Sequence, residues 1–217
     1  MSAGPGPAEP GAAWVGSAEL RDGTRLELRP LDEGTWDHLV ELFTGRGQQH
    51  FCWCMFFRLT NREFSPGWGD GNREALRALV AAGGQPGLVA YDGGRPVGWV
   101  SAGPREDFGR VGRSPTIRPV QAGPDELVWS MVCFYIPPAW RGRGLGAALL
   151  DGAARWAATA GATAVECYPV DPERRTVTSA DAYPGLVAWC QATGFTEVTR
   201  RGTDNPKGRA IMRRQLV

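Results

Sequence analysis

The chain has 217 residues, of which 42% are hydrophobic and 22% charged, which is enough for one buried core and too few for two. A formal net charge of +1 provides no global field that would gather nucleic acid or an anionic membrane surface, so neither is expected as a partner. The five cysteines form no C-x-x-C pair, which fits neither a disulfide framework nor a four-cysteine zinc site and favours a reducing cytoplasm.

The N-terminal part of the sequence predicts a tail followed by ordered elements. Residues 1–22 are rich in Gly, Ala, Pro and Ser and lack a basic start or an apolar run, which indicates a disordered tail and not a signal peptide. Alternating residues predict a strand over 24–28, and Thr35 is placed to cap a helix with an apolar face. An aromatic-rich connection over 46–70 follows, after which Asn72 is predicted to cap a second helix.

The middle of the sequence predicts a hairpin, a long loop and a buried strand. Residues 87–102 surround the turn Asp92-Gly93-Gly94, whose residues tolerate positive φ, so a β-hairpin is expected. Residues 103–124 have no clear periodicity, and a connection of that length in a compact domain is usually a lid or a mobile insert. The apolar run over 127–136 predicts a buried strand that ends before Pro137, which cannot donate to a ladder.

The C-terminal part adds the elements that complete a single domain. Apolar residues at helical spacing predict a helix over 145–161, and a short strand follows over 163–168. Asp181 is predicted to cap a last helix, and two terminal strands flank a turn at 204–208. We therefore expect one domain over 23–217, of the α/β (α+β) class.

One glycine-rich segment, Arg141-Gly142-Arg143-Gly144-Leu145-Gly146, opens the most periodic helix shortly after a proline break. Glycines let the backbone approach a ligand closely, and the first N–H groups of a helix are unpaired at its positive end. Arg141 and Arg143 can add charge-assisted hydrogen bonds to the same ligand, although either side chain can equally be solvated. The segment therefore predicts a cradle for a pyrophosphate.

Two other nucleotide-binding patterns compete for this segment. The P-loop is excluded, because no Lys-Ser or Lys-Thr follows the glycines. Gly142, Gly144 and Ala147 satisfy the dinucleotide fingerprint G-x-G-x-x-A, and Glu166 lies about 20 residues further on, where that fingerprint has an acid. However, the strand does not run directly into the first glycine, and too few residues follow Glu166 to complete that sheet. A nicotinamide-dependent oxidoreductase is therefore kept only as a third alternative.

The stretch from Phe134 to Gly146 resembles the acyl-CoA signature of the GCN5-related N-acetyltransferase (GNAT) superfamily, which reads Arg or Gln, two residues, Gly, one residue, then Gly or Ala. Arg141, Gly144 and Gly146 occupy those positions, and the order of the predicted elements agrees as well. The resemblance implies a GNAT fold, with a mixed central sheet that is splayed at its middle strands and flanked by helices. It also implies acetyl-CoA as the acyl-donor co-substrate, without a metal.

The resemblance also assigns roles around the cofactor. In that superfamily the strand before the signature exposes backbone N–H groups that polarise the thioester carbonyl, and here this strand ends with Phe134, Tyr135 and Ile136. The residues implied to hold the pyrophosphate are Arg141, Gly142, Arg143, Gly144, Leu145, Gly146 and Ala147. The implied reaction is direct attack of a free amine, which requires proximity, a route for the ammonium proton and an acid for the leaving thiolate.

The sequence departs from the family pattern at the expected general acid. Many members carry a tyrosine four residues before a Gly-Phe pair, and in this chain Cys190 stands at that position. Cys190 is either a proton donor or a small core residue, and Tyr183 is either a second candidate acid or a rim aromatic. The candidate bases are Glu166, Asp125 and Glu126, with the alternatives that each is an ordinary surface charge or that a water chain serves.

The aromatic segment between the first two helices falls where the resemblance places part of the acceptor pocket. The candidate acceptor-binding residues are Trp53, Met55, Phe56 and Arg58, although so many aromatic residues can equally cover the core. If they line the pocket, the acceptor is expected to be partly apolar or cationic. Cys52 and Cys54 with His50 make a poor tetrahedral set, so no metal site is expected there.

We therefore expect a cytoplasmic N-acetyltransferase that transfers an acetyl group from acetyl-CoA to a primary amine of a small molecule or peptide. The alternative is a catalytically degenerate member of the same fold that binds acyl-CoA as a sensor or interaction module, because the family tyrosine is missing. The sequence leaves open the identity of the acceptor, the acyl-chain length and the oligomeric state, a homodimer included.

Overall fold

The structure is a computed structural model that describes residues 14–44, 49–117, 119, 121–173, 176–178, 181–198 and 209–216. Its strands are β1 (Gly16–Glu19), β2 (Arg25–Pro30), β3 (Gly87–Asp92), β4 (Arg95–Pro104), β5 (Val128–Tyr135), β6 (Ala164–Cys167), β7 (Thr196–Glu197) and β8 (Met212–Gln215). Its α-helices are α1 (Trp36–Phe43), α2 (Gln49–Cys52), α3 (Asn61–Phe64), α4 (Asp70–Ala81), α5 (Gly109–Arg113), α6 (Leu145–Thr159) and α7 (Val187–Ala192). Three short 3₁₀ turns are η1 (Met55–Phe57), η2 (Arg105–Asp107) and η3 (Pro138–Trp140).

The strands form one mixed sheet in the order β1-β2-β3-β4-β5-β6-β8-β7. Neighbouring strands are antiparallel throughout, except that β5 and β6 run parallel. The predicted hairpin is confirmed as β3 and β4, whose turn contains Gly93 and Gly94 with φ of 53° and 87°. Both glycines adopt the left-handed conformation that other residues avoid, which fixes the position of this turn.

The sheet opens at its middle, between β5 and β6. These two strands are paired only from Val128 and Ala164 to Met131 and Cys167, whereas β5 continues to Tyr135 beside β4 alone. A register shift against β4 leaves Val132 as an extra residue in β5, and such a bulge bends the strand. The predicted mixed sheet with splayed middle strands is therefore confirmed.

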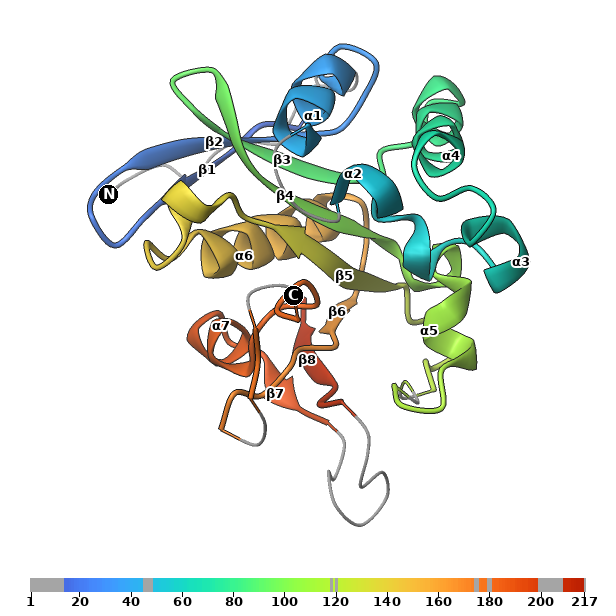
Figure 1. Cartoon of the computed structure of the whole chain (residues 1–217). Helices are drawn as coiled ribbons and strands as arrows, with labels where there is room; N and C mark the ends of the chain where they lie inside the picture. Colours follow the sequence, from blue (N-terminus) through green and yellow to red (C-terminus); the bar gives the residue numbers. More distant parts are fainter. Residues whose placement is uncertain are drawn as a thin grey trace.

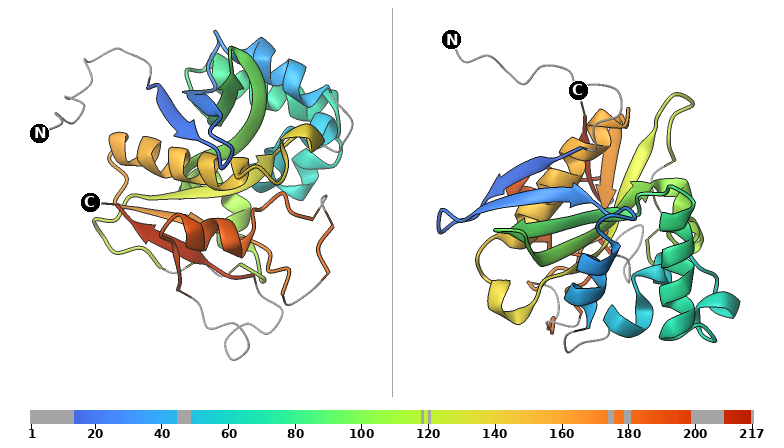
Figure 2. Two further views of the ribbon diagram at one scale, coloured as in Figure 1. Left: turned by 90° about the vertical axis from the view of Figure 1, so that its left-hand side faces the viewer. Right: turned by 90° about the horizontal axis from the view of Figure 1, so that it is seen from above.

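Helices cover both faces of this sheet (Figures 1 and 2). Leu88 and Ala90 of β3 face the core on the α6 side, whereas Val89 and Tyr91 face the core shared with α1. This alternation follows from the period of two residues in a strand, and it explains why β3 reads as a continuous apolar run. The α1 side also carries α2 to α4, and Cys54 of the aromatic segment contacts Cys133 of β5.

Helix α6 confirms the prediction for residues 145–161. Leu149, Leu150 and Ala153 are completely buried against the sheet, and burial of each leucine contributes roughly 2 kcal/mol. The helix is preceded by Gly144 and followed by Gly161, both with positive φ. Its start is therefore held at the open end of β5 by a long apolar face.

Three predicted segments are more ordered than the sequence indicated. Strand β1 lies inside the predicted tail and pairs with β2, so the prediction for 1–22 is wrong over 14–22, while 1–13 lie outside the described residues. The connection at 46–70 contains α2, η1 and α3, and the loop at 103–124 contains η2 and α5. Short helices stabilised mainly by tertiary contacts leave little periodicity in a sequence.

Two predicted helix caps are wrong. Asn72 lies inside α4, is completely buried, and donates from Nδ2 to the Phe51 carbonyl at 3.1 Å. Asp181 lies in a turn and accepts from the Thr178 backbone at 3.1 Å, and α7 begins only at Val187 because Gly185 has φ of 92°. Strands β7 and β8 pair as predicted, whereas the predicted turn at 204–208 lies outside the described residues. Over the residues that the structure describes, no helix is long and apolar enough to cross a membrane.

Candidate active site

The glycine segment forms a tight loop between η3 and α6. Gly142 and Gly144 have φ of 76° and 96°, which favours glycine at both positions. Gly146 lies against α7, since a Cβ atom there would meet the Trp189 ring at 2.6 Å. The first N–H groups of α6 have no acceptor within the helix, and the loop presents the positive end of the helix dipole. The local geometry therefore has the form of an anion cradle.

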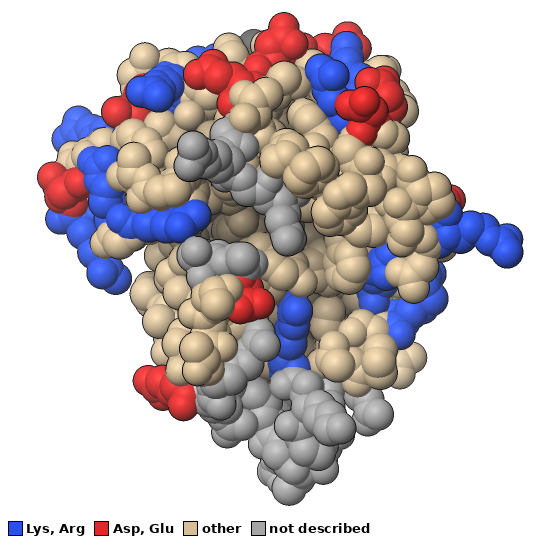
Figure 3. All heavy atoms as spheres, in the orientation of Figure 1, with Lys and Arg blue, Asp and Glu red and all other residues tan. Residues whose placement is uncertain are grey.

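A cavity of about 940 Å³ joins this loop to the end of β5 and to the aromatic segment. At the loop it is lined by Arg21, Trp140, Arg141, Gly142, Gly144, Leu145, Gly146, Ala147, Leu186, Ala188, Trp189 and Ala192. Along β5 and beyond it is lined by Gln49, Cys52, Cys54, Phe56, Phe57, Phe64, Trp68, Cys133, Phe134, Tyr135, Ile136, Ala182 and Tyr183. In the space-filling view, the middle of this face is hollowed, and among the described atoms beside the hollow those of uncharged residues predominate (Figure 3).

Of the two signature arginines, only Arg141 lines the cavity. It is exposed, and its Nε donates to the Ile136 carbonyl at 3.1 Å. Arg143 instead donates to Asp22 at 2.7 Å and to the Thr24 hydroxyl at 2.8 Å, so it ties the loop to the β1–β2 turn. The hydrogen bond from Arg143 lowers the pKa of Asp22 to about 2. The predicted contact of Arg143 with a phosphate therefore has no support in this structure.

Arg21 is a cavity residue that the sequence analysis missed. Arg21 belongs to the predicted tail, but its backbone N–H donates to the Arg143 carbonyl at 3.2 Å, which brings it beside the loop. Its side chain lies beside Gly144, because a Cβ atom built on that glycine would be 3.3 Å from Arg21 Cγ. No local sequence pattern indicates this contact, because it depends on the pairing of β1 with β2.

The open edge of β5 is partly occupied by the segment before α7. The Phe134 N–H donates to the Tyr183 carbonyl at 2.6 Å, and Val170 bridges Leu186 nearby. In this structure the Phe134 donor, expected to polarise a thioester, is therefore already paired within the chain. The Tyr183 side chain lines the cavity, and its hydroxyl accepts from Arg209 Nη2 at 3.3 Å.

Cys190, the residue at the family's tyrosine position, does not line the cavity. It is completely buried in the core around α6, where its neighbour is Cys167. Burial raises the pKa of Cys167 well above its usual value, which shows how apolar this environment is. Cys190 thus has the position of a small core residue, and the structure gives no support for a role as proton donor.

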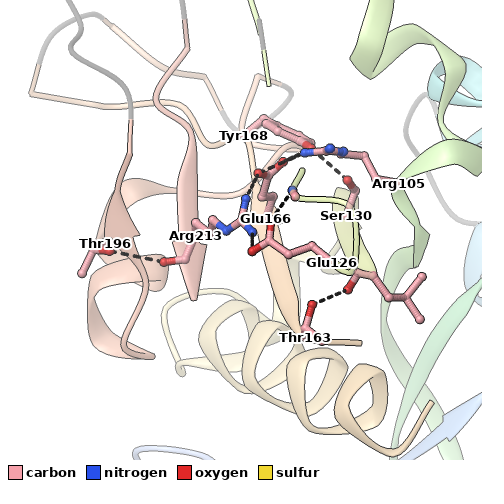
Figure 4. A network of polar contacts seen from close by, with 10 residues as sticks. Arg105, Glu126, Ser130, Thr163, Glu166, Tyr168, Thr196 and Arg213 are labelled. Atoms are coloured by element: carbon pink, nitrogen blue, oxygen red, sulfur yellow. Dashed lines mark hydrogen bonds and ion pairs between the residues drawn. The ribbon is translucent and has the colours of Figure 1, made fainter. Parts of the chain in front are cut away.

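Glu166 belongs to a buried ion-pair network and does not line the cavity (Figure 4). Its carboxylate accepts from Arg105 at 3.1 Å, from Arg213 at 3.2 Å and from the Tyr168 hydroxyl at 2.9 Å. Glu126 accepts from the same Arg213 at 2.5 Å, and hydrogen bonds from the Gly123 N–H and from Arg213 lower its pKa. Neither this carboxylate nor that of Asp125 lines the cavity. The three predicted bases are therefore not placed to accept the proton of an amine in the cavity.

Only one of the four predicted acceptor residues reaches the cavity, namely Phe56. Trp53 and Met55 are buried, with the Trp53 ring stacked 5.9 Å from that of Trp36. Arg58 is also buried and pairs with Asp107 at 3.2 Å. The short helices and turns of this segment direct Trp53 and Met55 to the core, and Cys52, Cys54, Phe56 and Phe57 to the cavity.

Three thiols lie together on the cavity wall. Cys54 Sγ is 3.1 Å from Cys133 Sγ, accepts from Trp99 Nε1 at 3.3 Å, and also contacts Cys52. Cys54 has φ of 50°, an uncommon conformation that its surroundings must stabilise. Contact with Cys133 and burial raise the pKa of Cys54, so the Cys54 thiol is neutral. Within the described ranges, no group of three or more His, Cys, Asp or Glu side chains is arranged to hold a metal ion.

Comparisons with known proteins agree with this geometry. The profile of the acetyltransferase (GNAT) family matches residues 53–177, which is more than half of the chain. The fold is similar to the GNAT domain of S. lividans PAT, at 20% identity and a TM-score of 0.50, covering 96% of this chain and 100% of that one. It is also similar to Mycobacterium smegmatis RimJ in complex with CoA-disulfide, at 14% identity and a TM-score of 0.52, covering 93% and 86%.

A third similar structure is yncA from Salmonella typhimurium with its cofactor acetyl-CoA, at 18% identity and a TM-score of 0.50, covering 88% of this chain and 94% of that one. At these identities the similarity concerns the fold alone. No curated protein matches the sequence.

Proposed function

We propose, from the premise that the chain belongs to the acetyltransferase (GNAT) family, that it transfers an acetyl group from acetyl-CoA to a primary amine. The observation that carries the proposal is the continuity of one cavity, which begins at the glycine loop and follows the end of β5 beyond its pairing with β6. Such an arrangement suits a long ligand that has a pyrophosphate at one end and its reacting group at the other.

The residues present fit coenzyme A. The loop from Gly142 to Gly146 supplies backbone N–H groups at the start of α6, and its three glycines leave this backbone open to close approach. Arg21 and Arg141 line the same end of the cavity and add positive charge for the phosphates. The end of β5 offers a strand edge for the pantetheine arm, although the Phe134 N–H is available to it only after the Tyr183 carbonyl has moved aside.

The chain's own residues contribute positioning and one proton. Acetyl-CoA, when bound, supplies the activated acetyl group as a thioester. The cradle and β5 hold the reacting end beside Tyr183, whose hydroxyl carries a proton at the cavity wall and donates it to the departing sulfur. Arg209, 3.3 Å from that hydroxyl, stabilises the phenolate that results. No carboxylate or histidine lines the cavity in the described part of the chain, so water carries the ammonium proton away.

The competing function is an acyl-CoA-binding module without catalysis. Two observations favour it: the thiol at the family's tyrosine position is buried in the core, and the Phe134 donor is paired with the Tyr183 carbonyl. Such a protein would bind acetyl-CoA as tightly as an enzyme does, but it would not release CoA faster when amines are added. Turnover therefore separates the two functions.

The test is release of free thiol from acetyl-CoA in the presence of a panel of primary amines. We expect the wild-type protein to release thiol faster with at least one amine than without amine. Gly144→Glu should abolish binding and release, because it places bulk and negative charge in the cradle beside Arg21. The matched control is Gly161→Glu, which introduces the same residue at a similar φ of 82° at the far end of α6. Binding without release by the wild-type protein would favour the module.

A further inference from the structure

The end of the cavity away from the glycine loop is a slot built from aromatic rings. Phe57 lies 6.4 Å from the Tyr183 ring, and Phe56 lies 5.1 Å from Phe57 and 5.5 Å from Phe64. Trp68 continues this series, with its centroid 5.6 Å from that of Phe64. These contacts form an unbroken series of rings from the proposed proton donor to the surface.

The outer rings of this slot are exposed. Trp68 is 47% exposed and Phe56 37%, and Phe51, which is 39% exposed, stacks on Trp68 at 5.7 Å. Exposed large apolar side chains that gather at the mouth of a cavity mark a binding surface. The Phe51 carbonyl accepts hydrogen bonds from the Gly69 N–H and from Asn72 Nδ2, which ties the backbone of Phe51 to the chain just after Trp68.

The walls of the slot carry no negative charge. Among the residues that line the cavity in the described ranges, the charged ones are Arg21 and Arg141, and both lie at the glycine-loop end. The thiols of Cys52 and Cys54 are neutral, because their mutual contact and burial raise the pKa of Cys52 far above its usual value, and contact with Cys133 does the same for Cys54. An ammonium group that enters the slot therefore finds no carboxylate to offset its loss of hydration.

A cation of the protein itself already lies over two of these rings. The Arg110 guanidinium already lies over Phe56, 4.3 Å from the ring centroid, and 5.7 Å from that of Phe64. Its Nε is fixed by the Leu59 carbonyl at 2.9 Å. Arg110 therefore brings positive charge to the position where cation–π contacts would otherwise attract an ammonium group, and it repels such a ligand.

Resting on the proposed function, we infer that the acceptor is a small monoamine that carries an aromatic ring, and not a polyamine, an aminoglycoside or another acceptor with several ammonium groups. Its ring stacks in the slot between Phe56 and Trp68, and its amine reaches the thioester beside Tyr183. The same uncharged walls lower the pKa of the bound amine, which gives the neutral nucleophile without a protein base. A diamine would have to lose two protons, or bury one charge, in the same place.

The test compares 2-phenylethylamine with putrescine and kanamycin, with free thiol as the readout and acetyl-CoA binding measured separately by thermal shift. We expect kcat/KM for 2-phenylethylamine to exceed that for either polycation by at least about tenfold. Equal or faster turnover of putrescine or kanamycin overturns the inference and leaves the proposed function intact. Failure to bind acetyl-CoA refutes the proposed function itself.

If acetyl-CoA binds but no amine in the panel is turned over, equilibrium binding of the amines tests the inference about the acceptor. 2-Phenylethylamine should then raise the melting temperature of the CoA-bound protein, whereas putrescine should not, and the absence of that difference overturns the inference.

Substitutions in the slot test where the aromatic ring of the acceptor binds. Trp68→Ala should raise KM for 2-phenylethylamine about tenfold, with KM for acetyl-CoA unchanged, and Trp68→Phe should restore most of the loss. Leu127→Ala removes a similarly exposed apolar side chain outside the cavity and should have no effect. An unchanged KM for 2-phenylethylamine in Trp68→Ala contradicts the proposed position of the ring.

Discussion

Replacing Glu166 with glutamine removes the negative charge at the centre of a buried network that joins η2, β6 and β8. The carboxylate is completely buried, and the side chains of its partners Arg105 and Arg213 are only 19% and 7% exposed. Leaving buried guanidinium groups without their charge partner should cost about 3 kcal/mol of the free energy of unfolding. For a chain of this size, that corresponds to a fall of roughly 6 to 12 °C in melting temperature.

The measurement is urea denaturation together with steady-state kinetics of the same variant. We expect Glu166→Gln to lose stability while kcat/KM of the folded protein stays within about threefold of the wild-type value, because the side chain does not line the cavity. Glu126→Gln is the matched control, because Glu126 shares Arg213 but its side chain is 30% exposed. This substitution should lower the free energy of unfolding by only about 1 kcal/mol. A Glu166→Gln protein that is as stable as the wild type but inactive would refute this reasoning and restore the residue as a base.

Three further predictions concern the cavity and the core. Arg21→Ala should weaken CoA binding by about 1.5 kcal/mol, roughly tenfold, without altering the affinity for the amine, as calorimetry would detect. Tyr183→Phe should lower kcat by about 100-fold with KM for acetyl-CoA unchanged, and a wild-type rate would exclude the hydroxyl as the proton donor. Cys190→Ala should leave kcat unchanged but lower the free energy of unfolding by about 1 kcal/mol, because it removes a buried sulfur atom from the core; lost turnover in a stable protein would contradict this.

The glycine loop and α6 are predictable from sequence because both depend on nearby residues. The backbone has positive φ at positions 142 and 144, which favours glycine there. The apolar residues of α6 recur at helical spacing because one face of the helix is buried against the sheet. The same holds for the β3–β4 hairpin, whose turn glycines are adjacent. The fold family follows from these local features together with the order of the elements.

The roles of Glu166 and Arg21 are not predictable in this way, because their partners are distant in sequence. Arg105 and Arg213 reach Glu166 from 61 and 47 residues away, and no local pattern shows that a carboxylate on a strand will be enclosed by them. Arg21 lies in a stretch whose composition is typical of tails, yet β1 places it at the cradle. In both cases, contacts with residues that are distant in sequence decide where the side chain lies.

Tyr183 illustrates a third limit. Helical spacing places it on one face with Cys190, but Gly185 has φ of 92° and packs against Phe134 and Cys167, so the helix starts after it. A Cβ atom at position 185 would lie 3.3 Å from the Phe134 ring. Tyr183 lines the cavity, but it lies in the turn at 181–184 that precedes α7 and not in a helix.

The most direct test of the central claim is a thermal-shift titration of the protein with acetyl-CoA, CoA and NAD. A ligand present at 100 times its Kd stabilises the native state by about 2.7 kcal/mol, which for a chain of this size raises the melting temperature by roughly 5 to 11 °C. We predict this rise with acetyl-CoA and CoA and none with NAD. A rise with NAD alone, or with none of the three, would contradict the assignment of the glycine loop as an acyl-CoA cradle.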